Sequence, residues 1–439
     1  MLNKFLFKPI DNSALIVFRI LFGFLISLES FGAIVSGWVH QALVEPKYTF
    51  SFIGFEWLQP LPDFWMYVYY AIMGVCGLLV MVGYKYRWSI ISFAVLWSGT
   101  YFMQKTSYNN HYYLLILLSV FMVVVPANTR LSLDSKNNSS IQSNIMPNWC
   151  ALIFIIQMWI VYTCASIAKL YPDWLDTSVI EILVKSKKDY FIIGNLLQKK
   201  WMHYIIAYFG IIFDLVIVPL LLWKQSRKYA FLVTIVFHLF NSIVFQIGIF
   251  PYMSLALCVF FFEPKTIRKI FLKKLKSIES KKETVFKKSN FIKIVFISYF
   301  VVQLVLPLRH WVIKGDVLWT EEGHRLSWRM MLRARQGIIS FRVIDKENNQ
   351  AIPIQLDTYL TYKQQRNFAT KPDMIWQFSQ FIKKIYKEEV NRDVMVFVDC
   401  QIKVNGKPFK PFIDPKVDLA SVKWNAFKHS PWILPSKQD

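Results

Sequence analysis

Long apolar runs alternate with short polar segments along the chain as far as about residue 310. The runs cover roughly residues 14–35, 66–83, 88–103, 112–126, 148–168, 204–223, 229–247, 252–262 and 290–308. A helix that crosses a bilayer needs about 20 apolar residues, and most of these runs approach that length. The runs at 112–126 and 252–262 are shorter, which fits tilted or partly re-entrant helices. The pattern predicts a polytopic α-helical membrane bundle with eight to nine transmembrane helices.

The pattern changes after about Trp319, where apolar positions begin to alternate with polar ones. Alternating β-branched and aromatic residues predict strands at 338–344, 351–356 and 394–404. Met374–Tyr386 carries its apolar residues on one broad side, which predicts an amphipathic helix. We therefore expect a transmembrane helical domain over residues 1–310 and a small α+β domain over residues 311–439.

Basic residues gather in a subset of the loops and orient the bundle. They are dense at 84–87, 224–228 and 265–288. Cytoplasmic loops of membrane proteins carry an excess of Lys and Arg, so these three loops are predicted to be cytoplasmic. With nine helices, the N-terminus is then inside and the α+β domain is extracytoplasmic. The expected protein is an integral, multi-pass membrane protein.

Composition agrees with a membrane location. Hydrophobic residues make up 55% of the 439 residues and the formal net charge is +23. In a soluble protein that charge would suggest nucleic acid, but here many basic residues flank apolar runs, where they can face anionic lipid. The five cysteines show no CxxC spacing that would indicate zinc or a disulfide framework. We expect a lipid bilayer as partner, no nucleic acid and no metal.

A lysine at the end of one apolar run is the first candidate for chemistry. Lys169 lies on the same helical face as Tyr162 and Ser166. From its position alone, the simpler interpretation is a side chain that extends to the membrane interface. The functional interpretation is a buried, desolvated amine that serves as a base.

Polar side chains also stand beside or inside other apolar runs. His111 follows Asn109 and Asn110 where a short loop enters a helix, which indicates either turn and capping chemistry or a polar pocket. His238 and Asn241 share one face of the apolar run 229–247. Helix–helix hydrogen bonding explains Asn241 adequately, whereas His238 remains open to either interpretation.

A basic cluster follows the last apolar run. Its arginines are Arg325, Arg329, Arg333 and Arg335. Guanidinium groups near a membrane surface recognise carboxylate or bicarbonate-like anions, and lipid phosphate is the competing partner. Within the cluster, Met330 and Met331 beside Trp328 fit simple packing.

The order of these motifs along the chain resembles the vitamin K-dependent γ-glutamyl carboxylases, in their bacterial, HTTM-domain form. The resemblance runs from about Phe7 to Pro435. Its pieces are FKPIDNSALIVFRILFGFL, LPDFWMYVYYAIMG, KTSYNNHYYL, AKLYPDW, FHLFNSIVFQIGIFPYM, the LP..H pattern at 306–310, SWRMM and IDPKVDLASVKWNAFKHSPW. Several pieces are long and unusual in composition, so the match is specific.

The resemblance implies an enzyme of the peptidyl-glutamate 4-carboxylase type, a carbon–carbon lyase that epoxidises vitamin K. Such an enzyme couples oxygenation of a reduced quinone (phylloquinol or menaquinol) to carboxylation of peptide glutamate, with O₂ and CO₂ as co-substrates and no metal. The expected partner is a glutamate-containing peptide or exported protein. Two alternatives remain: a quinol epoxidase or oxygenase without protein carboxylation, and a non-catalytic quinone- or lipid-binding membrane protein.

The resemblance also implies roles for individual residues. Lys169 matches the base that starts the reaction, and His111 matches a residue that supports a developing oxyanion. The candidate substrate- or quinone-binding residues are Asn109, Asn110, His238, Asn241, Ile247, His310, His324, Trp328, Met330, Met331, Arg333 and Arg335. The sequence departs from the family at His324, where the family has tyrosine, and at Arg333, where it has histidine. These departures motivate the oxygenase alternative.

Overall fold

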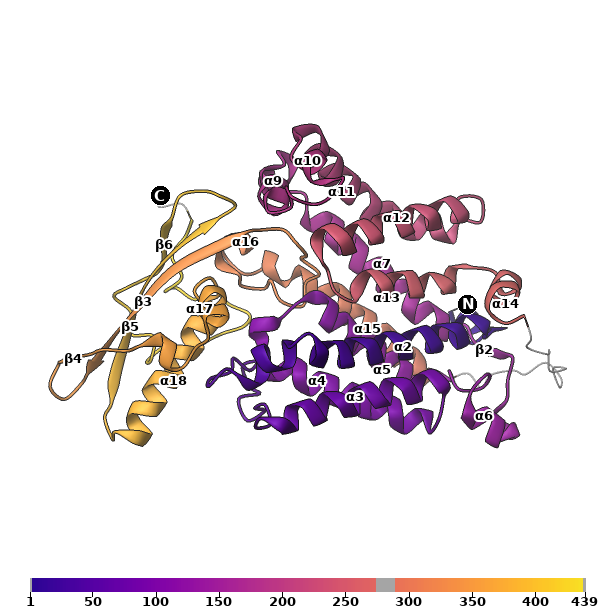
Figure 1. Cartoon of the computed structure of the whole chain (residues 1–439), viewed down its shortest axis with the longest axis horizontal. Helices are drawn as coiled ribbons and strands as arrows, with labels where there is room; N and C mark the ends of the chain where they lie inside the picture. Colours follow the sequence, from indigo (N-terminus) through magenta and orange to yellow (C-terminus); the bar gives the residue numbers. More distant parts are fainter. Residues whose placement is uncertain (1, 274–288, 437–439) are drawn as a thin grey trace.

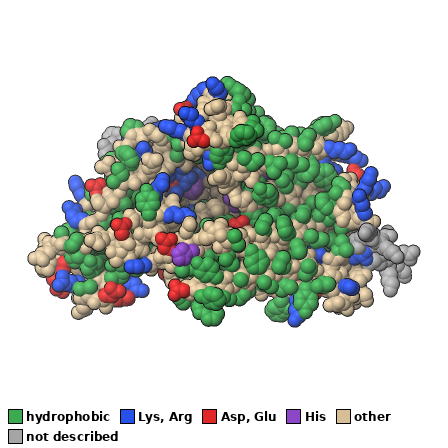
Figure 2. Space-filling model, viewed as in Figure 1, with side chains coloured by type: hydrophobic (Ala, Val, Ile, Leu, Met, Phe, Trp, Pro, Cys, Tyr) green, Lys and Arg blue, Asp and Glu red, His purple; other side chains and the backbone are tan. Residues whose placement is uncertain are grey.

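The computed structural model describes residues 2–273 and 289–436. A bundle of helices runs along the long axis of the molecule, and a sheet with two helices closes one end of it (Figure 1). The apolar bundle surface is broad and green in Figure 2, whereas Lys and Arg side chains gather toward the two ends and on an upper lobe. This distribution is the one expected of a protein whose middle lies in lipid.

Each predicted apolar run falls on a helix. The helices are α2 (Ser13–Val35), α3 (Phe64–Val82), α4 (Tyr86–Met103), α5 (Asn110–Val124), α7 (Trp149–Ala168), α11 (Lys200–Leu222), α12 (Arg227–Phe245), α13 (Phe250–Leu257) and α15 (Asn290–Leu308). Within the described residues, six of them are long and apolar enough to cross a membrane: α2, α3, α7, α11, α12 and α15.

The other three helices explain why the predicted count of eight to nine is not confirmed. Helices α5 and α13 are apolar but short. Helix α4 has 18 residues, and hydroxyl groups such as those of Ser92, Ser98 and Thr100 dilute its apolar character. An apolar run therefore located a helix correctly without showing that the helix spans the bilayer.

Glycines allow α2 and α3 to pack closely. A Cβ atom placed on Gly77 of α3 would lie 2.7 Å from the backbone nitrogen of Ser27 in α2. Small residues at helix contacts let two backbones approach, which is the usual way that membrane helices associate. The backbones of α2 and α3 are therefore in direct contact at these glycines.

We expect Gly77→Ala to lower the free energy of unfolding by about 1–3 kcal/mol, because the added methyl group forces the two backbones apart. Thermal unfolding of the purified protein measures the effect. Gly210→Ala in α11 is the matched control, since a Cβ there has no atom within 4 Å. Equal destabilisation of both variants would contradict the close-packing argument.

The segment between α7 and α11 folds into an upper lobe rather than an open loop. It contains the short helices α8 (Pro172–Leu175), α9 (Ser178–Lys185) and α10 (Gly194–Leu197). The indole nitrogen of Trp174 donates to the carbonyl of Ala207 at 3.2 Å, which ties α8 to α11. The lobe stands beside the end of α11 that is nearer the sheet (Figure 1).

The C-terminal part contains an antiparallel sheet of strand order β4-β3-β5-β6. The strands are β3 (Arg335–Asp345), β4 (Ala351–Ile352), β5 (Val394–Val404) and β6 (Lys410–Ile413). The helices α17 (Tyr362–Phe368) and α18 (Pro372–Glu389) cover one face of this sheet. Every second residue of β5 from Val394 to Val404 is buried, and these residues share a core with Phe378 and Ile382 of α18.

Two of these strands agree with the prediction from the sequence, and the others agree only in part or were not predicted. The predicted strands at 338–344 and 394–404 lie in β3 and β5. The predicted strand at 351–356 is wrong beyond Ile352, because Pro353 lacks the N–H that would continue the ladder. Strand β6 and helix α17 were not predicted.

The opposite end of the bundle is small and basic. It contains β1 (Pro9–Asp11), β2 (Ile145–Pro147), α6 (Leu133–Asn137) and α14 (Pro264–Phe271). Strands β1 and β2 pair antiparallel, and Arg268 of α14 forms an ion pair with Asp11 of β1. Part of the basic segment predicted to be cytoplasmic, residues 274–288, lies outside the described residues. The part that is described, in α14, lies at the end of the bundle away from the sheet (Figure 1).

Candidate active site

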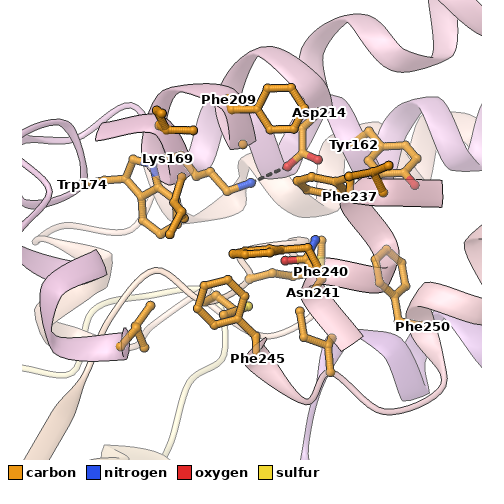
Figure 3. Close-up of a pocket in the computed structure, with 18 of the residues that line it drawn as sticks. Tyr162, Lys169, Trp174, Phe209, Asp214, Phe237, Phe240, Asn241, Phe245 and Phe250 are labelled. Atoms are coloured by element: carbon orange, nitrogen blue, oxygen red, sulfur yellow. Dashed lines mark hydrogen bonds and ion pairs between the residues drawn. The ribbon is translucent and has the colours of Figure 1, made fainter. Parts of the chain in front are cut away.

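A cavity of about 240 Å³ lies between α7, α11 and α12, beneath the upper lobe. Aromatic side chains form a large part of its wall, as Figure 3 shows: Trp174, Phe209, Phe237, Phe240, Phe245 and Phe250. The polar groups that line it are His111, Tyr162, Lys169, Asp214 and Asn241. A few polar groups in an apolar enclosure are typical of a small-molecule site.

Lys169 and Asp214 form an ion pair in the wall of this cavity (Figure 3). Lys169 follows the last residue of α7, and Asp214 lies in the middle of α11. Their side chains are 10% and 6% exposed, so the lysine is buried and does not extend to the membrane interface. Asp214 was not predicted from the sequence, although an acidic residue inside an apolar run is itself a signal of function.

Two further contacts fix the position of the lysine amine. The indole ring of Trp174 lies 5.7 Å from Lys169 Nζ, within the range of a cation–π interaction. The hydroxyl of Ser166, one turn before Lys169, donates to the carbonyl of Ile211 at 2.9 Å and so joins α7 to α11. The amine is therefore held between two helices that are themselves bonded together.

His238 contacts a residue of the cavity wall without lining the cavity itself. Its Nε2 lies 2.7 Å from the hydroxyl oxygen of Tyr162, and the ring is fully buried. Tyr162 lines the cavity, whereas His238 does not. His238 therefore orients the tyrosine, and Asn241, one turn further along α12, faces the cavity itself.

His111 faces the cavity from the first turn of α5. Its ring stacks on Phe250 with centroids 4.7 Å apart, and its Nδ1 has no hydrogen-bond partner among the described residues. Asn109 caps α5 by accepting a hydrogen bond from the backbone N–H of Tyr112 at 2.8 Å. The cap fixes the helix start and thereby the direction of the His111 ring.

The second asparagine of this motif joins the bundle to the later arginine-rich segment. Asn110 donates to the carbonyl of Arg329 at 3.0 Å and accepts from the Tyr108 hydroxyl at 3.0 Å. A second pocket, of about 350 Å³, lies next to the main cavity and is lined by Asn109, His111, Ile247 and Met331. The capping interpretation and the pocket interpretation of this motif therefore both describe its structure.

The remaining candidates do not form one site. Met330, Met331 and Ile247 line the main cavity. Trp328 is buried and stacks on Tyr113 with centroids 5.0 Å apart. His310 lies in a separate groove of about 630 Å³, where its Nε2 accepts from Arg329 at 3.3 Å.

His324, Arg333 and Arg335 line a third space, a polar cavity of about 310 Å³ beside the start of α18. Arg333 comes only two residues after Met331, so the backbone between them passes from one cavity to the next. Spacing in the sequence did not show this change of side, because the segment is irregular and has no fixed periodicity. Among the described residues, no three His, Cys, Asp or Glu side chains come together to hold a metal ion.

The main cavity is open toward the side of the bundle. Ile205, Phe209 and Val236 line it and are also 51%, 44% and 62% exposed. They belong to α11 and α12, two helices long and apolar enough to lie in lipid. In Figure 2 a hollow is visible beneath the upper lobe, with basic and His side chains inside it. A ligand dissolved in lipid can reach such a cavity without crossing water.

Comparison with known proteins covers nearly the whole chain. Residues 7–265 match the HTTM domain model, which spans more than half of the chain. Residues 288–439 match the lumenal domain model of vitamin K-dependent γ-carboxylase, whose name indicates an extracytoplasmic C-terminal part. No solved structure matches the chain. The two matches follow one another in the order of the bundle and the sheet, and the chain therefore belongs to the vitamin K-dependent γ-carboxylase family of integral membrane proteins.

Proposed function

We propose that this protein couples oxygenation of reduced vitamin K to carboxylation of glutamate in an exported peptide or protein. The observation that carries the proposal is the buried Lys169–Asp214 pair in an aromatic cavity that opens between lipid-facing helices. In the overall reaction, one atom of O₂ enters the quinone epoxide and the other leaves as water. CO₂ replaces the γ-hydrogen of glutamate, which is released as a proton.

The cavity fits a quinol with a hydrocarbon tail. Phe237, Phe240 and Phe245 line the cavity with aromatic rings that suit a flat aromatic ligand, and His111 Nδ1 is a buried polar atom without a partner among the described residues. The side opening between α11 and α12 suits the tail. When bound, reduced vitamin K would supply the reducing equivalents and the strong base that glutamate deprotonation requires.

In this proposal, Lys169 accepts the first proton from a quinol hydroxyl. Its amine must be neutral to do so, and the Asp214 carboxylate next to it can hold the proton that the amine gives up. A buried site of low dielectric narrows the free-energy difference between the charged pair and the neutral pair. His111 then donates a hydrogen bond to the oxyanion that develops, and the aromatic wall excludes water.

We expect Val236→Trp to raise the KM for a long-tailed menaquinol about tenfold, because the indole fills the side opening, a loss of about 1.4 kcal/mol of binding. Menadiol, which has no tail, should be affected much less. Initial rates of quinol oxygenation measure both. Val295→Trp on α15 is the control, since Val295 is exposed on a membrane helix and does not line the cavity. Equal losses with both quinols would place the entrance elsewhere.

The direct test of the function uses purified protein in nanodiscs with reduced vitamin K, O₂, labelled bicarbonate and a glutamate-containing peptide. Quinone epoxide and peptide label are followed together, beside a known carboxylase as a working control. Both products support the proposal. Epoxide without label would make the protein a quinol oxygenase, and neither product would favour a quinone- or lipid-binding protein.

A further inference from the structure

A second enclosed site lies where the bundle meets the C-terminal domain. We name it the cationic cavity and define it by its five basic lining residues: Lys105, Arg325, Arg333, Arg335 and Lys371. Its volume is about 310 Å³. Lys105 comes from the loop before α5, and Lys371 directly precedes α18. The cavity is thus built from both parts of the chain.

The five cations share two carboxylates within the described part of the chain. Glu321 pairs with Arg333, with Arg335 at 3.5 Å and with Lys371 at 2.6 Å. Asp373 pairs with Lys105 at 2.9 Å and with Arg325 at 2.5 Å. Five positive and two negative groups leave a formal surplus of three positive charges in a buried place.

The carboxylates cannot offset this surplus further, because both are already ionised at neutral pH. Burial opposes ionisation of Asp373, but Arg325 and Lys105 hold its pKa at about 2. Burial likewise opposes ionisation of Glu321, and Arg333 and Lys371 keep its pKa well below the ordinary value. Only the protonation of the basic residues can therefore lower the surplus of positive charge.

Partial deprotonation of the two lysines lowers the surplus of positive charge only slightly. Burial lowers the pKa of Lys371 to about 7, so this lysine is charged in part of the molecules at neutral pH. Burial lowers the pKa of Lys105 to about 8, which leaves it mostly charged. Between two and three uncompensated positive charges remain, and burying unpaired charge is costly. A network that served only to join two domains would be expected to be closer to neutral.

We propose that the cationic cavity binds a dicarboxylate of the malonate type. A monocarboxylate would leave one to two positive charges uncompensated, whereas a dicarboxylate removes two and leaves the site nearly neutral. The fixed fork of a guanidinium group matches a carboxylate with two parallel hydrogen bonds. The side chains of Arg325 and Lys371 are 19% and 24% exposed, so the charge is accessible.

This inference rests on the proposed function. The product of that reaction, γ-carboxyglutamate, carries a malonate group at the end of its side chain. Met331 lines the Lys169 cavity and Arg333 lines the cationic cavity. Residues two apart in a chain are separated by at most about 7 Å, so the two cavities are neighbours along this segment. One acceptor chain can then hold an already carboxylated residue in the cationic cavity while another glutamate approaches Lys169.

The test measures binding of malonate itself, without quinol, by its effect on thermal unfolding of the protein in nanodiscs. Acetate and inorganic phosphate at equal ionic strength are the comparison anions. We expect malonate to bind at least about tenfold more tightly than either, a difference of about 1.4 kcal/mol. A peptide containing γ-carboxyglutamate should compete with labelled malonate, and its glutamate counterpart should compete at least about tenfold less well.

Lys371→Met removes one cation while Glu321 keeps its two arginines, and we expect it to weaken malonate binding about tenfold. Lys371→Arg should restore the affinity. Lys346→Met, in an exposed pair with Asp393, should leave it unchanged. Equal binding of acetate and malonate, tighter binding of phosphate, or an unchanged affinity in Lys371→Met would overturn the proposal. Malonate binding in a protein that forms no epoxide would instead show that the proposed function alone has failed.

Discussion

Lys169→Ala should lower the rate of quinol oxygenation by at least about 100-fold, the lower range for loss of a general base. The substitution removes the one amine that lines the aromatic cavity within the described part of the chain. Aqueous hydroxide is a poor replacement, because most of the residues that line the cavity are apolar. Epoxide formation in nanodiscs, measured at saturating quinol, reports the loss in kcat.

Two controls separate chemistry from folding. Lys85→Ala changes a lysine in the loop between α3 and α4, far from the cavity in the chain and on the basic side, and should have nearly no effect. The thermal unfolding of Lys169→Ala should still show a cooperative transition. Equal loss of activity in Lys85→Ala and Lys169→Ala would indicate a folding defect and remove the assigned role of Lys169.

Asp214→Leu should lower the free energy of unfolding by about 3–5 kcal/mol, because it leaves the buried ammonium of Lys169 without its partner. It should also lower quinol oxygenation strongly, since the carboxylate that holds the Lys169 amine in position is then absent. Unfolding of the protein in detergent measures the first effect, and epoxide formation measures the second.

The double variant Lys169→Met, Asp214→Leu tests whether the lost stability comes from the ion pair itself. Replacing both partners of a buried ion pair by apolar residues of similar size is often nearly neutral for stability. We therefore expect the double variant to recover most of the stability lost in Asp214→Leu and none of the activity. Additive losses of stability would mean that the two side chains do not interact in the folded protein.

Much of the architecture could be predicted because a bilayer leaves a chain few options. A backbone in lipid must satisfy its own hydrogen bonds, so a long apolar run has to be a helix, and each predicted run lies on one. Strand β5 was predicted with its observed ends, Val394 and Val404, because one buried face imposes a period of two. Local pattern was sufficient in both cases.

The candidate site could be predicted only in part. Lys169 was identified as a candidate base, but the choice between an interfacial lysine and a buried one depends on what stands opposite to it. Asp214 stands there, 45 residues further along the chain. The arginines after Trp328 were grouped as one cluster, yet Arg329 lies in one groove while Arg333 and Arg335 lie in another cavity.

Apolar length, periodicity and residue type predicted the positions of the apolar helices, the two main strands and most of the polar residues that line the main cavity. Which polar groups meet depends on the fold. It placed Lys169 against Asp214 and His238 behind Tyr162, and it divided the basic residues between separate cavities. Burial and electrostatic pairing depend on distances between segments remote in the chain, which no local pattern encodes.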